Sequence, residues 1–417
     1  MAVVVVYDQG SASPREVIAL GRTAPVLVAL ADSEHARQVG PLFEENCAGV
    51  VALAEGDGAV VDRLREYGAA GILTFSERML ADTARLAGLL GLPFNTPETV
   101  RVLTDKAAQR RRLREAGVDG VRSALLTDAD GWQAALTEVG LPAVVKPVRG
   151  EGSRNTVLVT DPDRGAAVVE EFLRAEPALV VEEFLQGADC APFGDYVSVE
   201  SAVTPGGIRH FAVTGKLPLA PPFRESGQFW PSQLAPGPEA EVVELADRAL
   251  RALGVTHGLV HTEIKLTAAG PRLIEVNGRL GGDQTDLAAR SLGLDLVALA
   301  GELALGRDVE PSPARPERVH FQYYTPGPTG GGRLTRVDGQ AAVRALPGVD
   351  SYRLSVRPGT ELAAGTGTTL LDMLCGSAAD HRGMTALVER AVALLAYEFV
   401  VDGRSVTRTA RDLLDHL

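Results

Sequence analysis

The chain has 417 residues, of which 45% are hydrophobic and 23% are charged, a composition typical of globular proteins and not of globally disordered ones. Its formal net charge of −13 argues against a nucleic-acid-binding protein with a broad basic surface, although a small basic pocket for phosphate is compatible with it. At about 150 residues per domain, the length predicts about three domains.

The N-terminal sequence does not have the features of a targeting signal. Its apolar run is short, and it lacks a basic segment before the run and a cleavage-type segment after it. The longest apolar stretches of the chain fall below the ~20 residues of a membrane-spanning helix. Cys47, Cys190 and Cys375 are widely separated and indicate neither a disulfide framework nor a zinc cluster. We therefore expect a cytoplasmic protein without a membrane partner.

Short apolar runs alternate with helical stretches, such as Asp62–Gly68 and Glu77–Leu90, in the first predicted domain. Four such runs indicate buried parallel strands, namely Val3–Tyr7, Val26–Leu30, Gly49–Leu53 and Gly71–Phe75. This alternation predicts a parallel sheet covered on both faces, which is a small Rossmann-like domain over residues 1–98. No GxGxxG follows the first strand, so we do not expect this domain to bind its own dinucleotide.

The second segment contains a glycine-rich turn between two predicted strands. After a proline-containing boundary, a helix capped by Thr104 or Asp105 is predicted over Lys106–Ala116. The strands Ala143–Lys146 and Val157–Thr160 then enclose the glycine-rich turn. This strand–turn–strand order differs from the strand–loop–helix of a P-loop NTPase, whose GxxxxGK[ST] motif is absent.

Lysines next to this turn predict a phosphate site. Lys146 ends a buried strand directly before the turn, whose backbone amides can surround phosphate oxygens with Gly152, Ser153 and Arg154 nearby. A solvated strand end is the alternative for Lys146. Lys106 stands near a helix start, where the helix dipole disfavours a cation unless an external anion is bound.

The next elements follow in a mixed order. They are a strand at Leu179–Phe184, a hairpin of Tyr196–Val203 and Arg209–Thr214, a helix at Gly237–Leu253, a second hairpin of Gly258–Leu266 and Pro271–Val276, and a helix at Asp286–Leu305 interrupted by Gly293. A proline-rich spacer at Pro311–Pro316 precedes a mixed strand and helix segment that extends to residue 417. We expect residues 99–310 to form one domain of two halves, 99–187 and 188–310, with residues 311–417 as a C-terminal α+β domain.

The second hairpin carries the most informative chemistry. Strand alternation places His261 and Glu263 on one face, and Glu275 and Asn277 on the matching face of the partner strand. Two carboxylates and an amide oxygen would then converge, and such hard oxygen ligands suit Mg²⁺ together with substrate phosphates. Arg279 could bind a phosphoryl or carboxylate oxygen beside them. A solvated polar face of an edge hairpin is the alternative.

These segments, taken in order, resemble the ATP-grasp superfamily. The resemblance rests on Thr104–Lys106, Pro142–Pro147 with its glycine-serine loop, Val181–Gly187, His261–Lys265 and Ile274–Arg279, and it covers roughly residues 1–310. It implies an ATP held between two α+β subdomains behind a Rossmann-like pre-domain. It also implies formation of an acyl-phosphate and its attack by an amine or a similar nucleophile.

The resemblance assigns roles to the matching residues. Lys106 and Lys146 are similar to the two nucleotide-binding lysines, and the adenine hinge corresponds to Glu182, Glu183, Phe184 and Leu185. Asp195 is a candidate for holding the ribose, although an inserted stretch interrupts the usual spacing. The expected Mg²⁺ ligands are Glu263, Glu275 and Asn277, with Mn²⁺ as an alternative ion. Arg279 is expected to stabilise the transferring phosphoryl group, and Lys216 to add fixed positive charge.

Within the superfamily, the chain is most similar to bacterial L-amino-acid ligases that form dipeptides. The similar stretches are Asp195–Ser201, Thr214–Lys216, Arg224–Ser226, Trp230–Ser232 and His261–Leu266. Gln228 stands where that family has a histidine, and Gly281 and Gly282 stand where it has bulky pocket residues. The resemblance implies that substrate is bound by these three residues together with Arg279 and Glu225. Glu225 either positions the amine or caps a loop.

The resulting expectation is an ATP-dependent ligase for a small carboxylate and an amine, with a homodimer left open. One rival is a carboxylase that acts through carboxyphosphate, which would use the same ATP site. A second rival is a non-catalytic nucleotide-binding protein, for which we would expect the loss of a metal ligand.

Overall fold

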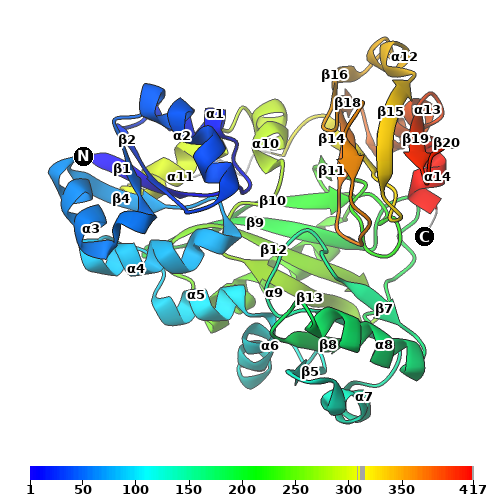
Figure 1. The fold of residues 1–417 in the computed structure, drawn as a ribbon, viewed down its shortest axis with the longest axis horizontal. Coiled ribbons are helices and arrows are strands. Elements are labelled where there is room, and N and C mark those ends of the chain that lie inside the picture. Colours follow the sequence, from blue (N-terminus) through cyan, green and yellow to red (C-terminus); the bar gives the residue numbers. More distant parts are fainter. Residues whose placement is uncertain (308, 310–314, 416–417) are drawn as a thin grey trace.

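The computed structural model describes residues 1–307, 309 and 315–415, and its chain forms four sheets (Figure 1). The first sheet has the strand order β3–β2–β1–β4 and consists of β1 (Ala2–Tyr7), β2 (Val26–Leu30), β3 (Gly49–Ala52) and β4 (Ala69–Leu73). Its strands are parallel, and its helices are α1 (Pro14–Ala19), α2 (Glu34–Asn46), α3 (Asp57–Glu66) and α4 (Leu80–Leu90). The predicted Rossmann-like topology is confirmed. The fourth strand ends at Leu73 and not at Phe75, because Phe75 leaves the sheet to enter a buried cluster described below.

A second, antiparallel sheet lies at the lower end of the molecule in Figure 1. Its order is β5–β8–β6–β7, with β5 (Ser123–Leu126), β6 (Ala143–Pro147), β7 (Val157–Val159) and β8 (Leu179–Glu183). The helices of this region are α5 (Pro97–Thr104), α6 (Lys106–Glu115), α7 (Trp132–Val139) and α8 (Pro162–Leu173). Of the two proposed caps for α6, Asp105 is the one used: its carboxylate accepts a hydrogen bond from the Ala108 amide at 2.8 Å. The glycine-rich turn joins β6 and β7 as predicted.

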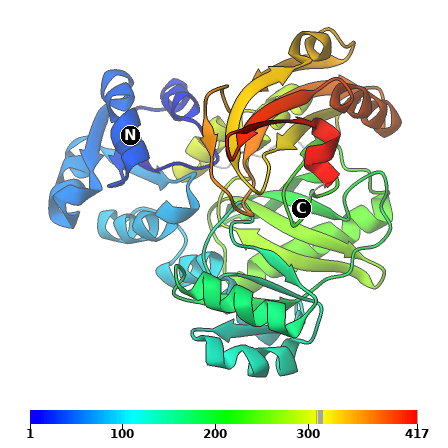
Figure 2. The ribbon, with the colours of Figure 1, turned by 45° about the vertical axis from the view of Figure 1, so that its right-hand side comes forward.

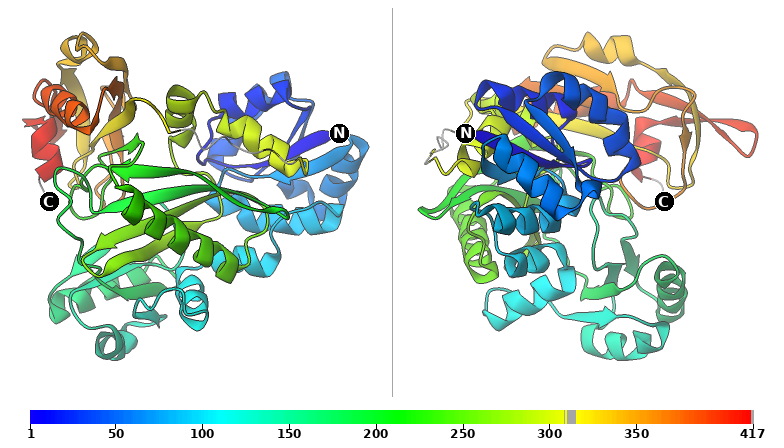
Figure 3. Two further views of the ribbon diagram at one scale, coloured as in Figure 1. Left: turned by 180° about the vertical axis from the view of Figure 1, so that it is seen from behind. Right: turned by 60° about the vertical axis from the view of Figure 1, so that its left-hand side comes forward.

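The third sheet is the longest, and it continues from the central region into the C-terminal segment. Its order is β13–β12–β9–β10–β11–β14–β18–β16, with β9 (Tyr196–Thr204), β10 (Gly207–Lys216), β11 (Gly227–Trp230), β12 (Gly258–Thr267), β13 (Gly270–Asn277), β14 (Val319–Pro326), β16 (Val349–Leu354) and β18 (Leu370–Ala378). Helices α9 (Pro236–Leu253), α10 (Gln284–Leu292), α11 (Leu296–Ala304) and α13 (His381–Val392) pack against it. Figure 3 shows α9 across one face of the sheet. Gly293, in a left-handed conformation, ends α10, so the predicted helix over 286–305 is two helices.

The C-terminal segment adds a small fourth sheet in front of the long one (Figure 2). Its order is β17–β15–β19–β20, with β15 (Gly332–Asp338), β17 (Glu361–Leu362), β19 (Ala396–Val401) and β20 (Arg404–Thr409), and the remaining helices are α12 (Gln340–Arg344) and α14 (Ala410–Asp415). Because β11 pairs with β14, no sheet edge separates residues 188–310 from this segment. The proposed domain limits stay predictions, and most of the predicted spacer, residues 311–314, lies outside the described residues.

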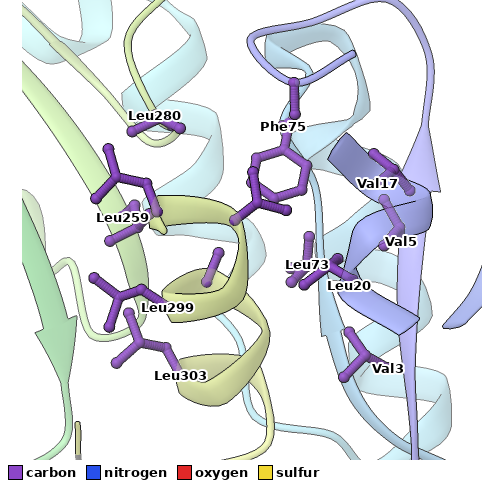
Figure 4. Packing of buried hydrophobic residues seen from close by; sticks show 14 of the residues in the cluster. Val3, Val5, Val17, Leu20, Leu73, Phe75, Leu259, Leu280, Leu299 and Leu303 are labelled. Atoms are coloured by element: carbon purple, nitrogen blue, oxygen red, sulfur yellow. The ribbon is translucent and has the colours of Figure 1, made fainter. Parts of the chain in front are cut away.

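A buried apolar cluster joins the first sheet to the rest of the molecule. Residues of α11, among them Leu299 and Leu303, pack between β4 and β12 and meet Leu73 of β4 and Leu259 of β12 (Figure 4). Burying side chains of this size stabilises the contact by roughly 1.5–3 kcal/mol each relative to exposure. The parallel sheet is therefore fixed on the central domain by a continuous core.

Helix α6 covers the edge of the long sheet at β13. The Gln109 side chain exchanges two hydrogen bonds with the Val276 backbone, at 2.9 and 2.8 Å. The Arg110 guanidinium donates to the Leu273 and Ile274 carbonyls, each at 2.7 Å. These side chains satisfy an edge that would otherwise present unpaired backbone groups.

Among the described residues, no helix combines the length and apolar character needed to cross a membrane.

Candidate active site

A cavity of about 520 Å³ lies where the first three sheets and the C-terminal segment meet. The residues that line it include most of the predicted site, namely Lys106, Lys146, Gly152, Ser153, Glu182, Glu183, Phe184, Leu185, Lys216, Glu225, Glu263, Glu275, Arg279 and Gly282. The structure thus brings together residues that are up to 176 positions apart in the chain, from Lys106 to Gly282. A volume of this size is in the range of sites that bind small molecules.

Four predicted residues are not among those that line the cavity in the described part of the chain: Asp195, Gln228, Asn277 and Gly281. Asp195 accepts a hydrogen bond from Lys265 at 2.6 Å. Gly281 lies behind the cavity wall, where a Cβ atom would come within 2.5 Å of His261 Nδ1. Asn277 is buried opposite His261 at the end of the hairpin. Strand alternation predicted the face of β13 on which Asn277 lies, but not how deeply its side chain is buried.

Glu182 is the centre of a buried ion-pair network. Its carboxylate accepts two hydrogen bonds from Arg110, both at 2.9 Å, and pairs with Lys146 Nζ at 2.9 Å. Burial opposes its charge, but the two cations outweigh burial and lower the pKa of Glu182 to about 2. Since Arg110 also binds the β13 backbone, this network ties the two halves that enclose the cavity.

Arg110 and Lys146 therefore occupy the Glu182 carboxylate, so the predicted contact of this segment with an adenine base depends on backbone groups. The Glu183 amide donates to the Arg122 carbonyl at 3.0 Å, and the Phe184 amide donates to the Pro142 carbonyl at 3.1 Å. The Leu185 amide, which follows the end of β8, has no hydrogen-bond partner within the described residues. Leu185 lines the cavity, so its amide is a candidate donor to an edge of a planar base.

The two predicted carboxylates, Glu263 and Glu275, face each other across the hairpin. Glu263 of β12 and Glu275 of β13 are direct cross-strand partners, a position that brings Cβ atoms to about 4.5–5.5 Å. Cations now balance both carboxylates: Lys106 Nζ lies 3.1 Å from Glu275, and His261 Nε2 lies 3.4 Å from Glu263. Burial opposes the charge of Lys106, and Glu275 outweighs it, so the pKa of Lys106 is raised.

A buried acid supports the histidine. Both Glu200 oxygens lie within 3.0 Å of His261 Nδ1, and Glu200 also accepts hydrogen bonds from Ser198 and Thr214. Burial lowers the pKa of His261, but Glu200 outweighs it and raises the value to about 9. The imidazolium in turn helps to lower the pKa of Glu263 to about 2, against the effect of burial. Glu263 is therefore held as an oriented carboxylate anion.

The Glu263 and Glu275 carboxylates fit a Mg²⁺ ion whose remaining ligands are water and substrate phosphates. No group of three or more His, Cys, Asp or Glu side chains in the described chain is arranged to hold a metal alone. Mg²⁺ usually takes only one or two protein carboxylates and completes its shell with water and substrate phosphates. Glu263 and Glu275 offer two facing carboxylates in a cavity also lined by Lys146 and Arg279, which can attract the phosphates.

Lys216 lies against two predicted substrate residues. Its Nζ donates to Gln228 Oε1 at 3.2 Å and lies 3.6 Å from the Glu225 carboxylate. Gln228 is saturated by further hydrogen bonds to the Gly282 carbonyl, Gln284, Gln322 and Tyr324. Gln228 therefore positions Lys216 from behind, while Glu225 shares the cavity with it.

Arg279 has a partner that the sequence did not indicate. Its guanidinium lies 3.4 Å from Glu77, which belongs to the Rossmann-like domain, and 3.2 Å from Glu151 of the glycine-rich turn. Burial is the main reason that the pKa of Glu77 is raised to about 7. The only sequence signal was the position of Glu77 just after a predicted parallel strand, where ligand-binding loops of α/β sheets gather.

The glycine-rich turn is held by the C-terminal segment. The Thr368 amide donates to the Gly152 carbonyl at 3.0 Å, and the Glu225 amide donates to Thr368 Oγ1 at 3.4 Å. Arg154 of the turn pairs with Glu176. Thr368 also lines the cavity, so residues 317–417 supply part of its wall. Nothing in the local sequence around Thr368 predicted this contact.

Comparison with known proteins gives a consistent result. The protein family described as ATP-grasp domain matches residues 104–283. An uncharacterized protein, y4rH, of Sinorhizobium fredii is 31% identical over 309 residues, which cover 72% of this chain and 61% of the relative. The alanine–anticapsin ligase of Bacillus subtilis is 28% identical over 301 residues, which cover 67% of this chain and 63% of the relative. The match thus spans about three fifths of these two relatives.

A solved structure shares the fold. The L-amino acid ligase from Bacillus licheniformis superposes with a TM-score of 0.75 at 22% sequence identity, covering 94% of this chain and 97% of that chain. The mixed architecture predicted from the sequence, with a Rossmann-like domain before an ATP-grasp fold and a C-terminal α+β segment, is confirmed by this likeness.

Proposed function

Residues 104–283 of this chain are an ATP-grasp domain, and from this premise we propose that the protein is an ATP-dependent carboxylate–amine ligase. It would form an amide bond through an acyl-phosphate and release ADP and phosphate. The observation that carries the proposal is the joint lining of one cavity by phosphate-binding cations, a glycine-rich turn and the facing carboxylates Glu263 and Glu275.

ATP would enter with its base near β8 and its phosphates toward the hairpin. Lys146 and Lys106 supply fixed positive charge for the phosphates, and the amides of the turn at Gly152 and Ser153 add donors. Leu185 offers a backbone amide to the base. Asp195 accepts a hydrogen bond from Lys265, so it could bind the ribose only if that hydrogen bond were replaced by one from the sugar.

The first chemical step transfers the γ-phosphoryl group to the substrate carboxylate. A carboxylate oxygen attacks the γ-phosphorus, the bond to the bridging oxygen breaks, and ADP leaves. Mg²⁺ held by Glu263 and Glu275, with Asn277 close behind, would neutralise phosphate charge. Arg279 and Lys216 line the cavity beside these groups and would stabilise the two approaching anions.

In the second step the amine nitrogen attacks the acyl carbon. The bond from that carbon to the phosphate oxygen breaks, phosphate leaves and the amine loses a proton. Glu225, whose carboxylate lies 3.6 Å from Lys216 Nζ, would orient the amine. Water must be excluded because it would hydrolyse the acyl-phosphate, and the contact of Thr368 with Gly152 supports a closed turn over the site.

Amino acids are the substrate class that the relatives favour. The names of the alanine–anticapsin ligase and the L-amino acid ligase both describe ligation of amino acids. A carboxylase acting through carboxyphosphate is the second candidate, because biotin carboxylase domains share the fold at low identity. The ligase is preferred because the relatives include the alanine–anticapsin ligase of Bacillus subtilis, whose match covers 67% of this chain.

A product-resolved screen tests the proposal. Purified protein with Mg²⁺ and ATP is offered pairs of amino acids, pairs of a small acid with an amine, and bicarbonate with an amine. The ligase requires ADP and phosphate release that depends on both partners, with a new amide detected by mass spectrometry. Release of AMP and pyrophosphate, or turnover that requires bicarbonate, would refute it. The same screen with Mn²⁺ in place of Mg²⁺ tests the proposed alternative ion. A measurement of molecular size in solution tests the proposed homodimer. The proposed location of the protein is the cytoplasm.

A further inference from the structure

The cations that line the cavity differ in whether a carboxylate already balances them. Seven of them have a carboxylate within ion-pair distance, namely Lys106, Arg110, Lys146, Arg154, Lys216, Lys265 and Arg279. Two others, Arg78 and Arg149, have no such partner among the described residues. Arg149 follows β6 beside the glycine-rich turn and so belongs to the phosphate side of the cavity. Arg78 comes from the Rossmann-like domain.

Arg78 stands on a short 3-10 helix, Glu77–Met79, and the segment that leads into it packs tightly against a loop of the cavity wall. Ser76 Oγ donates to the Gln9 carbonyl at 2.8 Å, and the Ser11 amide donates to the Phe75 carbonyl at 2.9 Å. Gly10 approaches so closely that a Cβ atom would lie 2.2 Å from the Phe75 carbonyl oxygen. Residues 9–11 and 75–78 therefore form one unit, and its members Gln9, Gly10, Ser11 and Arg78 all line the cavity.

This unit is fixed next to the reaction centre. Phe75 and Leu280 belong to the same buried cluster, which lies between the Rossmann-like domain and α11 (Figure 4). Leu280 directly follows Arg279, and Glu77 directly precedes Arg78 and lies 3.4 Å from Arg279. Arg78 is exposed to solvent and lines the cavity, on a segment that its contacts with residues 9–11 and the cluster around Phe75 hold in place.

We propose that Arg78 binds the carboxylate of the amine substrate, so that the amine substrate is an amino acid and not a neutral amine. This inference rests on the proposed function. Lys106, Lys146 and Arg149 line the cavity and would balance the phosphates of ATP. Arg279 and Lys216 also line it and would balance the carboxylate that is activated. An amino acid brings one more anion into the cavity, the carboxylate that is not activated, and Arg78 is the cation left for it. Arg can bind a carboxylate through two parallel hydrogen bonds.

The test compares an amino acid acceptor with its carboxamide, at a fixed activated substrate and saturating ATP. Wild-type protein is expected to use the amino acid with the higher kcat/KM. Arg78→Gln should raise the KM for the amino acid roughly 10- to 100-fold, as expected for a lost hydrogen bond to a charged group. The KM values for ATP and for the carboxamide should stay within about twofold, and Arg78→Lys should restore part of the selectivity. Arg22→Gln is the matched control, because Arg22 is exposed in the same domain and does not line the cavity.

The outcomes separate the two proposals. A wild-type protein that releases ADP with no acid–amine pair refutes the proposed function, and the subsite with it. An active wild type that accepts the carboxamide as well as the amino acid refutes the subsite alone. So does an Arg78→Gln variant whose KM values for amino acid and carboxamide rise together or stay unchanged.

Discussion

Replacing Glu182 by glutamine removes the carboxylate that pairs with two buried cations. The side chains of Arg110 and Lys146 are 5% and 8% exposed, and both contact the Glu182 carboxylate at 2.9 Å. Glutamine keeps the size of the side chain but removes its charge. Removing one partner of such a buried pair costs about 3–5 kcal/mol, because uncompensated charge stays in the interior.

The pKa of Glu182 gives a second, independent magnitude. The value falls from 4.5 to about 2 on folding, and at 1.36 kcal/mol per unit this corresponds to about 3 kcal/mol of stability. Because the folded-state pKa is the lower one, this stabilisation is complete above the unfolded pKa of 4.5 and is lost as the pH falls toward 2. Both arguments predict that loss of the Glu182 charge destabilises the protein.

Thermal unfolding at pH 7 measures the effect. A loss of about 3 kcal/mol lowers the Tm of a domain of 150–250 residues by roughly 6–12 °C. Glu98→Gln is the control: the Glu98 carboxylate pairs with Arg101, the two side chains are 68% and 45% exposed, and exposed pairs contribute about 0–1 kcal/mol. The Tm difference between wild type and Glu182→Gln should be constant from pH 6 to 8 and shrink below pH 4.5. A Glu182→Gln variant whose Tm falls no further than that of Glu98→Gln would show that Arg110 and Lys146 do not depend on this anion.

Three further changes, the last paired with a control outside the cavity, test other parts of the site. Glu275→Ala should abolish amine-dependent ADP release, because Mg²⁺ loses a ligand; near-normal turnover would remove Glu275 from the metal site. Lys146→Ala should weaken ATP binding about tenfold or more in calorimetry, and an unchanged affinity would contradict its phosphate role. Gly10→Ala should destabilise the protein by about 1–3 kcal/mol through its contact with the Phe75 carbonyl. Gly58→Ala, in a helix with open space around it, should stabilise by up to about 1 kcal/mol; equal effects of the two changes would contradict the packing argument.

Local sequence pattern predicted the elements that depend on local rules. The runs at β1 and β2 are apolar because both faces of a parallel sheet are buried, and their limits differ from prediction by at most one residue. Strand alternation placed Glu263 opposite Glu275, because the side-chain period of two and a short turn set the register. The glycine-rich turn between β6 and β7 was equally readable.

The depth of individual side chains was not a local property. Arg110 lies in the basic stretch of α6 that would ordinarily face solvent, yet it is 5% exposed because β13 and Glu182 meet it from other parts of the chain. Gln228 was expected to touch substrate, but its hydrogen bonds to Gln322 and Tyr324 of β14 hold it behind Lys216. In both cases a contact across more than 70 residues decides the environment.

The sequence by itself indicated the type of chemistry that we propose: the order of lysine, glycine-rich turn and facing carboxylates follows from strand periodicity and turn composition, which act over a few residues. Only the tertiary structure decided which further groups share the cavity. Arg78 lines it, and Glu77 pairs with Arg279 beside it, because the cluster around Phe75 and Leu280 docks one domain on the other. Thr368 reaches the cavity because β14 extends the central sheet. Burial of apolar area drives such docking without direction, so no short stretch of sequence specifies it.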